Sequence, residues 1–296
     1  MEMEDFRRLC SAFSLEELAQ AGGGNVSVKL GGDLALIKGS GSSLAAPSAV
    51  LYRLSTGEGI LGGTPSMEAP FHSRFRAYTV HVHPTAMLPY LTSPDCPGIP
   101  YAMPGPALAD SIPAEAYAQS VVFLRQHGVI FSADTISELL TVAADTYERF
   151  RTPAYVPLRL FWEVQAQFPE DVVYRVCPAE SAVYLPILRR FNIRNLTPDI
   201  ALYTYNRVHI QDDYLFLHAP TRESCLAALE VLRSYCEQVA ACQTALTEHQ
   251  VAEVLQSPRE RSRLSYTLHP RAPLASPSTS HVSLAAPEVP ETQDKA

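Results

Sequence analysis

The stretch Tyr78-Thr79-Val80-His81-Val82-His83-Pro84 alternates apolar side chains with imidazoles and then meets a proline. Successive side chains of a β-strand point to opposite faces, so His81 and His83 project together while Val80 and Val82 face a core. We therefore expect one strand of a buried sheet to present two histidines on the same face. Imidazole nitrogens are suitable zinc ligands, and this strand predicts one edge of a metal site.

His127 is the best-placed third ligand, because it lies in Gln126-His127-Gly128 between apolar, strand-like runs at 120–124 and 129–132. Three imidazoles leave one position of a tetrahedral ion open for substrate, which separates a catalytic site from a closed structural one. The chain has nine histidines, and a hydrogen-bonded core or surface role is the simpler interpretation for the others. These are His72, His209, His218, His249, His269 and His281.

Composition predicts a soluble globular chain with no nucleic-acid or membrane partner. Its 296 residues are 47% apolar, and the formal net charge is −8 with a pI near 5.6. An acidic chain has no electrostatic reason to bind nucleic acid or an anionic membrane surface. The six cysteines are scattered without a CxxC pair, and neither a signal peptide nor a membrane-length apolar run is evident. We therefore expect reduced cysteines and a cytoplasmic location.

Helical and strand periodicities flank the histidine strand in the first half of the chain. The predicted elements are a helix over 4–20, a hairpin of strands 25–30 and 33–38, a helix over 66–78 with Ser66 as its N-cap, and a helix capped by Asp134. This order of helices and strands predicts an α/β fold.

The pattern changes after about residue 167. Short strand-like runs and one long helical pattern then predict a second, smaller unit, with strands over 200–205, 208–210 and 215–217 and a helix over 222–247. From residue 257 onward Pro, Ser, Thr and Ala dominate without periodicity, which indicates disorder. We predict a main domain over 1–166, a small α/β accessory unit over 167–256 and a Pro/Ser-rich disordered tail over 257–296.

Five motifs in chain order carry a family resemblance. They are Gly23-Gly24-Asn25-Val26-Ser27-Val28-Lys29, Lys38-Gly39-Ser40-Gly41, Pro65-Ser66-Met67-Glu68-Ala69-Pro70-Phe71-His72, Val80-His81-Val82-His83-Pro84 and Gln126-His127-Gly128-Val129. Over roughly residues 6–150 the chain resembles the class II aldolase/adducin family, which includes fuculose-phosphate and rhamnulose-phosphate aldolases and ribulose-phosphate 4-epimerase. The resemblance implies a three-layer α/β/α domain around a central, mainly antiparallel sheet.

The resemblance also implies a site. Zinc, or another divalent metal, would be held by His81, His83 and His127, and Glu68 would be the catalytic acid/base group. Aldol cleavage removes a hydroxyl proton and leaves an enediolate, which a chelating metal stabilises as a Lewis acid. We therefore predict a zinc-dependent aldolase, a class II aldehyde-lyase of carbohydrate metabolism. It would cleave a ketose 1-phosphate or related sugar into dihydroxyacetone phosphate and an aldehyde.

Substrate contacts are implied for the glycine-rich and serine-containing loops. The positions that match phosphate ligands of the sugar-phosphate aldolases are Asn25, Gly39, Ser40, Gly41 and Ser66. Backbone N–H groups and hydroxyls in such loops can bind an anion, although glycine and serine also serve simply as turn residues. Met67 departs from the pattern, because those aldolases commonly carry a second serine there. Phosphate binding is thus less firmly indicated than metal binding.

Several alternatives remain open at this level. The same metal chemistry would serve a sugar-phosphate 4-epimerase or a dehydratase, and an adducin-like interaction module would keep the fold without catalysis. A Schiff-base route would need a desolvated lysine, for which Lys38 is the candidate. The family also uses a catalytic tyrosine, and Tyr101 is a candidate here. Family members are commonly cyclic tetramers, so we expect a homo-oligomer whose ligand is a small sugar or sugar phosphate.

Overall fold

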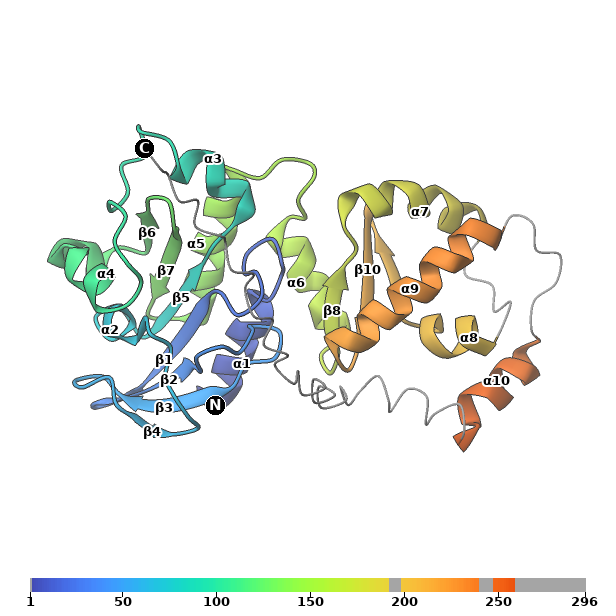
Figure 1. The fold of residues 1–296 in the computed structure, drawn as a ribbon, viewed down its shortest axis with the longest axis horizontal. Coiled ribbons are helices and arrows are strands. Elements are labelled where there is room, and N and C mark those ends of the chain that lie inside the picture. Colours follow the sequence, from blue (N-terminus) through green and yellow to red (C-terminus); the bar gives the residue numbers. More distant parts are fainter. Residues whose placement is uncertain (1, 192–197, 240–246, 259–296) are drawn as a thin grey trace, which may run out of the picture.

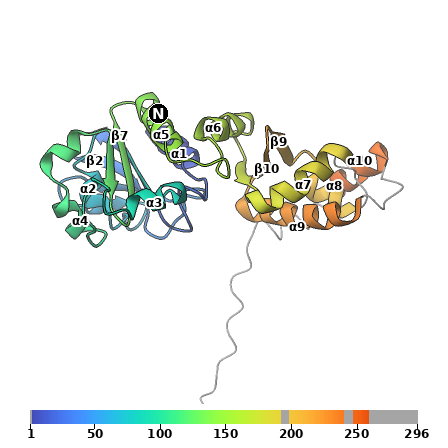
Figure 2. The same cartoon turned by 90° about the horizontal axis from the view of Figure 1, so that it is seen from above.

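A computed structural model describes residues 2–191, 198–239 and 247–258. The chain forms two lobes that lie side by side, as Figures 1 and 2 show from perpendicular directions. The N-terminal lobe contains a seven-stranded sheet, and the C-terminal lobe contains a three-stranded sheet. Helix α6 (Leu158–Gln167) lies between the two sheets (Figure 1).

The sheet of the N-terminal lobe has the strand order β4-β3-β2-β1-β5-β7-β6, and each neighbouring pair is antiparallel. Its strands are β1 (Asn25–Gly31), β2 (Leu34–Lys38), β3 (Ala49–Arg53), β4 (Gly59–Leu61), β5 (Tyr78–Val82), β6 (Val121–Leu124) and β7 (Gly128–Ala133). The predicted hairpin is confirmed as β1 and β2, and the predicted strands around His127 are confirmed as β6 and β7. The histidine strand, β5, lies in the middle of the sheet, between β1 and β7.

Helices cover both faces of this sheet and give the predicted three-layer α/β/α arrangement. The helices of the lobe are α1 (Glu2–Ala12), α2 (Ala69–His72), α3 (Leu88–Leu91), α4 (Pro106–Ser111) and α5 (Ile136–Glu148). On one face, α1 and α5 bury Phe6 and Leu139 in the same core as Val80 and Val82. On the other face, α2 and α4 form a separate core with Ile130. The valines of the histidine strand thus face a core, as the alternation predicts.

Three expected helix boundaries differ from the structure. The helix predicted over 4–20 ends at Ala12, because the chain beyond it uses a backbone carbonyl, that of Leu18, to accept from the His83 N–H. The helix predicted over 66–78 is only the four-residue α2, since Ser66 pairs through its backbone with Lys38 and residue 78 already belongs to β5. The N-cap of α5 is Thr135 rather than Asp134.

The C-terminal lobe has the sheet order β8-β10-β9, with helices packed on it. Its elements are β8 (Val172–Arg175), α7 (Pro178–Phe191), α8 (Pro198–Thr204), β9 (Val208–Gln211), β10 (Tyr214–Ala219), α9 (Arg222–Gln238) and α10 (Glu248–Gln256). The strands predicted over 208–210 and 215–217 are confirmed. The strand predicted over 200–205 is wrong: this stretch belongs to α8, where the Thr204 hydroxyl donates to the Ile200 carbonyl at 2.6 Å.

The long helix predicted over 222–247 is confirmed from Arg222 to Gln238. Residues 240–246 and the predicted disordered tail from 259 onward lie outside the described residues. Five cysteines in the described part are free: Cys10, Cys96, Cys177, Cys225 and Cys236. None of the helices in the described ranges is long and apolar enough to cross a membrane.

Contacts of α6 with α1, and of the small sheet with the core of the large one, join the two lobes. The Trp162 indole N–H donates to the Ala12 carbonyl at 2.7 Å, and the Gln165 amide donates to the Ser11 carbonyl at 2.7 Å. Phe216 of the small sheet is buried in the core that α1 and α5 form on the large one. The lobes are therefore packed together near the segment that follows α1.

Candidate active site

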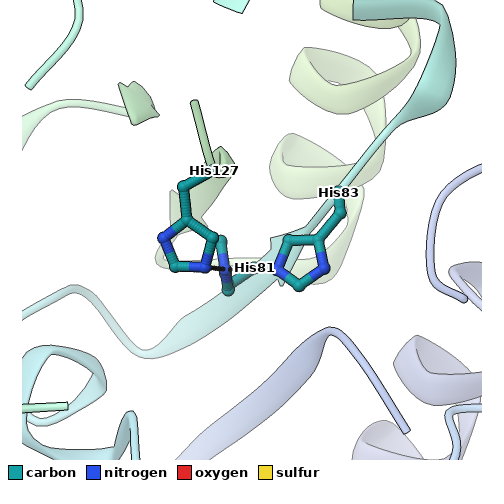
Figure 3. Close-up of side chains that lie close together, drawn as sticks. All are labelled: His81, His83 and His127. Atoms are coloured by element: carbon teal, nitrogen blue, oxygen red, sulfur yellow. Dashed lines mark hydrogen bonds between the residues drawn. The ribbon is translucent and has the colours of Figure 1, made fainter. Parts of the chain in front are cut away.

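The three histidines converge at the end of β5 (Figure 3). His81 is in the strand, His83 follows it directly, and His127 lies in the turn between β6 and β7. The Nε2 atom of His81 lies 3.0 Å from Nε2 of His83 and 3.4 Å from Nε2 of His127. One nitrogen from each ring lies within 4.8 Å of the other two, so this group could hold a metal ion.

The donor set fits a zinc ion or a similar divalent metal. The Nδ1 atom of His81 lies 3.1 Å from the Val129 carbonyl, and because a carbonyl only accepts, Nδ1 carries the proton and Nε2 keeps its lone pair. Tetrahedral zinc with bonds of about 2.0–2.1 Å to nitrogen needs ligand nitrogens about 3.4 Å apart, close to the distances between these rings. Burial keeps the imidazoles neutral, which is the form that binds metal.

The pKa values of the three histidines are all lowered. Burial lowers the pKa of His81 well below its usual range, and the neighbouring His83 and His127 lower it further. Burial and His127 lower the pKa of His83 to about 4, and burial also lowers the pKa of His127. At neutral pH the three rings are therefore neutral, and each has one nitrogen with a lone pair that can bind a metal.

Glu68 lies beside the imidazoles, at the N-cap of α2. Its Oε1 is 3.5 Å from Nε2 of His127, and its Oε2 is 3.7 Å from Nε2 of His81. The Asn25 amide donates to Oε2 at 2.5 Å, while Oε1 is buried without a hydrogen-bond partner among the described residues. Burial raises the pKa of Glu68 to about 7, although the Asn25 hydrogen bond and the nearby Lys38 oppose the shift.

The register of the sheet explains why residues far apart in sequence meet here. Asn25 in β1 is paired with His81 in β5, and His81 is paired with Ile130 in β7. Gly128 allows the close approach of the histidine strand, because a Cβ at this position would lie 2.4 Å from the Val82 carbonyl oxygen and 3.0 Å from the His81 ring. The sequence motif contains this glycine, but only the strand pairing shows its purpose.

The loops expected to bind phosphate form a second group. The Ser40 N–H donates to the Thr64 carbonyl at 3.0 Å and the Ser66 N–H donates to the Lys38 carbonyl at 3.2 Å, so the two loops are paired with each other. Gly39 also donates its N–H, to the Ser48 carbonyl at 2.8 Å. Among the described residues, no hydrogen bond joins Gly39, Ser40 or Gly41 to the histidines. Asn25, which was grouped with these loops, contacts Glu68 instead.

Lys38 is a buried cation whose role the sequence does not reveal. Its ammonium donates to the carbonyls of Gly22 at 3.0 Å, Ser42 at 2.5 Å and Gly39 at 3.4 Å. Three donated bonds use all the protons of an ammonium group, so this lysine holds the two glycine-rich loops together. The candidate Schiff-base lysine is thus engaged in loop structure.

His72, the last residue of α2, has the other role expected for a buried histidine. It is fully buried, its Nδ1 lies 2.8 Å from the Ser27 hydroxyl, and its ring stacks on Phe71. Burial, together with the charge of Lys29, lowers the pKa of His72 to about 3. It is a neutral core residue near the three clustered histidines, as the simpler interpretation of the sequence predicts.

The sequence places this chain in a known family. Residues 4–152 match the Class II Aldolase and Adducin N-terminal domain, and the chain belongs to this family. No curated protein sequence matches it. The matched range contains every strand of the large sheet and all of the residues of the candidate site.

Solved structures with similar folds cover about half of the chain. YgbL from Klebsiella pneumoniae, for which aldolase, epimerase and decarboxylase activities have been suggested, is 20% identical, with 55% of this chain and 91% of that chain covered and a TM-score of 0.45. The N-terminal class II aldolase domain of a Thermoplasma acidophilum protein is 22% identical, with coverages of 50% and 87% and a TM-score of 0.37. L-fuculose-1-phosphate aldolase from Thermus thermophilus is 18% identical, with coverages of 55% and 94% and a TM-score of 0.39.

Proposed function

We propose that this chain is a zinc-dependent aldolase, a lyase that cleaves a ketose 1-phosphate or related sugar into dihydroxyacetone phosphate and an aldehyde. The observation that carries the proposal is the position of Glu68, a buried carboxyl group with a pKa of about 7, beside three convergent neutral imidazoles. A structural zinc site would need neither an acid/base group nor an open ligand position. Family membership supports the same interpretation.

His81, His83 and His127 would hold the metal. When bound, a divalent ion would supply Lewis-acid stabilisation of the negative charge that develops on the carbonyl and hydroxyl oxygens of the sugar. The Val129 carbonyl fixes the tautomer and orientation of the His81 ring. Zinc suits three imidazoles, and other divalent first-row metals share this ligand preference.

Glu68 would move the proton. The Asn25 amide holds Oε2, so the carboxyl group has a fixed orientation and Oε1 is the atom at which a proton from a sugar hydroxyl is accepted. A pKa of about 7 means that both protonation states are populated at neutral pH, which is the condition for efficient general acid/base catalysis. Removal of that proton lets the adjacent carbon–carbon bond break: the carbon that bore the hydroxyl leaves as the aldehyde, and the bonding electron pair stays on the other fragment. Return of the proton from Glu68 to that carbon would give dihydroxyacetone phosphate.

The phosphate would be bound by Gly39, Ser40, Gly41 and Ser66 of the paired loops, and by the second amide proton of Asn25, since the first is donated to Glu68. The Ser40 and Ser66 hydroxyls and the Gly41 N–H are the donors that support this part of the proposal, because the N–H groups of Gly39 and Ser40 already donate to carbonyls. We also propose that the protein works as a homo-oligomer, in line with the family expectation.

The test is product formation by the metal-loaded protein. Purified protein is incubated with zinc and a panel of ketose 1-phosphates, and dihydroxyacetone phosphate is detected by a coupled dehydrogenase assay. We expect release from at least one member of the panel. Nuclear magnetic resonance on the same mixtures separates the alternatives, because inversion at one carbon without cleavage identifies an epimerase and loss of water identifies a dehydratase. Unchanged substrates throughout would contradict an enzymatic role and favour a non-catalytic interaction module.

A further inference from the structure

The segment 15–20, called here the support segment, holds the stretch of chain that carries His83. The His83 N–H donates to the Leu18 carbonyl at 2.7 Å, and the Thr85 N–H donates to the Glu17 carbonyl at 2.8 Å. The support segment is neither helix nor strand, and it is held by the Leu18 and Ala19 N–H groups, which donate to the Leu15 carbonyl, together with the contacts of its side chains. Whatever fixes the support segment therefore also fixes the backbone of His83.

The Glu17 side chain is the buried polar anchor of the support segment. Its carboxylate forms an ion pair with the guanidinium of Arg175, and the Tyr147 hydroxyl donates to Oε2 at 3.1 Å. The side chains of Arg175 and Glu17 are only 8% and 10% exposed, so water contributes little to the compensation of either charge. Removal of one partner leaves a buried charge unpaired, which costs far more than the loss of an exposed ion pair.

Arg175 belongs to the C-terminal lobe. It ends β8, where it is paired in register with Phe216 of β10. Its guanidinium also donates to the Ala154 carbonyl at 2.5 Å and lies 5.6 Å from the centre of the Tyr214 ring. Arg175 is therefore held rigidly before it meets Glu17, and the position of β8 is transmitted to the support segment.

A cavity of about 350 Å³ adjoins this ion pair and is lined by residues of both lobes, including Glu17, Thr85, Tyr155, Val173 and Arg175. Open space on this side means that close packing does not hold the support segment there. The buried ion pair is thus a polar restraint between the C-terminal lobe and the support segment, in addition to the apolar core that Leu18 shares with Phe216.

We propose that Arg175 and Glu17 are positioning residues through which the C-terminal lobe sets the geometry of the metal centre. The proposal rests on the proposed role of His83 as a metal ligand. It assigns the C-terminal lobe a function, since docking of β8 against the support segment places the imidazole of His83 for metal binding. The family match ends at residue 152, so this contribution comes from a part of the chain beyond it.

The test replaces Arg175 with methionine, which keeps the length of the side chain and removes its charge. Hydrogen exchange of the His83 and Thr85 amides is measured in metal-free protein, and zinc affinity is measured by competition with a chelating dye. We expect exchange at these two amides to accelerate at least about tenfold and zinc affinity to fall about tenfold, the lower end of what the loss of groups behind metal ligands costs. The exchange arm needs no metal, so its failure is distinguishable from failure of the proposed function.

A matched control is available in a neighbouring ion pair. Arg222 pairs with Glu16 between the same segment and the same lobe, but these side chains are 44% and 51% exposed. Arg222→Met should change zinc affinity less than about threefold, because exposed ion pairs contribute little. In the double variant Glu17→Gln/Arg175→Met no buried charge is unpaired, but the link between the C-terminal lobe and the support segment is still missing, so zinc affinity should stay reduced.

Two results would overturn the proposal. One is wild-type exchange at His83 and Thr85 in Arg175→Met; the other is acceleration spread evenly over the N-terminal lobe, which indicates general destabilisation. If Arg175→Met does not fold, Arg175→Lys carries the test, because lysine keeps the charge and loses the planar fork. Intermediate exchange at the same two amides supports the proposal, and wild-type exchange contradicts it.

Discussion

The proposed site has two halves: the histidine cluster and the paired loops around Ser40 and Ser66, called here the phosphate loops. The two halves differ in how far their polar groups already have partners within the chain. In the cluster, neutral Nε2 atoms face one another at 3.0 and 3.4 Å. In the loops, N–H groups that could bind an anion already donate to the carbonyls of Thr64 and Ser48. The nearby cation, Lys38, is likewise committed to backbone carbonyls.

This difference indicates that the histidine cluster is preformed for ligand binding, whereas the phosphate loops are not. The histidines lie in and directly beside paired strands at the centre of a sheet, and their Nε2 atoms already converge. Several backbone N–H groups of the loops already donate to carbonyls, so a substrate would find mainly hydroxyl donors there. Changes in the cluster should therefore have large effects on activity, whereas changes in the loops should have small ones.

The largest effect is expected at Glu68. Glu68→Gln keeps the shape of the side chain and its contact with Asn25 but removes the proton acceptor, so kcat should fall by about 10²–10⁴ with metal content unchanged. Steady-state kinetics and metal analysis of the same preparation check this, with the exposed Glu58→Gln as control. A kcat within about tenfold of wild type would show that Glu68 is not the acid/base group. Loss of metal would show that it is a ligand.

The second-largest effect is expected at His72, whose burial makes the stability of the fold depend on pH. Unfolded His72 takes up a proton below about pH 6.5, whereas the folded residue, with a pKa of about 3, does not. Burial of His72 therefore destabilises the fold increasingly as the pH falls. Relative to His72→Asn, wild type should lose about 2–3 kcal/mol between about pH 7.5 and pH 4.5. Urea unfolding of both proteins at the two pH values tests this, and a constant difference would contradict it.

The smallest effect is expected in the phosphate loops. Ser40→Ala removes one hydroxyl donor, worth about 1 kcal/mol, so KM for a phosphorylated substrate should rise less than about tenfold while kcat and metal content stay unchanged. The exposed Ser137→Ala on α5 serves as control. If KM is unaffected for the phosphorylated sugar, Ser40 does not contact the phosphate.

The sequence predicts the large sheet and the histidine cluster well, for reasons of periodicity. Alternation in β5 places His81 and His83 on one face, and the turn before β7 brings His127 to the same end. The prediction fails where contacts distant in the sequence decide the secondary structure. Residues after Ala12 have helical spacing, but the Leu18 carbonyl accepts from the His83 N–H. Residues 200–204 have strand-like composition but belong to α8.

Other parts of the site depend on contacts that no local pattern encodes. The pairing of Asn25 with His81 depends on the register between β1 and β5, and the contact of Glu17 with Arg175 depends on how the lobes pack. The sequence leaves Lys38 open as a Schiff-base lysine without favouring it, and its environment in the structure is a set of carbonyls. The boundary predicted at residue 166 and the roles of the phosphate-loop residues stay predictions.

Metal analysis of the wild-type protein and of His81→Ala tests the central claim most directly. Elemental analysis of extensively dialysed protein should find about one divalent ion per wild-type chain and almost none in His81→Ala, because a fully buried ligand is lost. His249→Ala, at an 83% exposed side chain in α10, should retain the wild-type content. Absence of stoichiometric metal from the wild type, or an unchanged content in His81→Ala, would contradict the metal site.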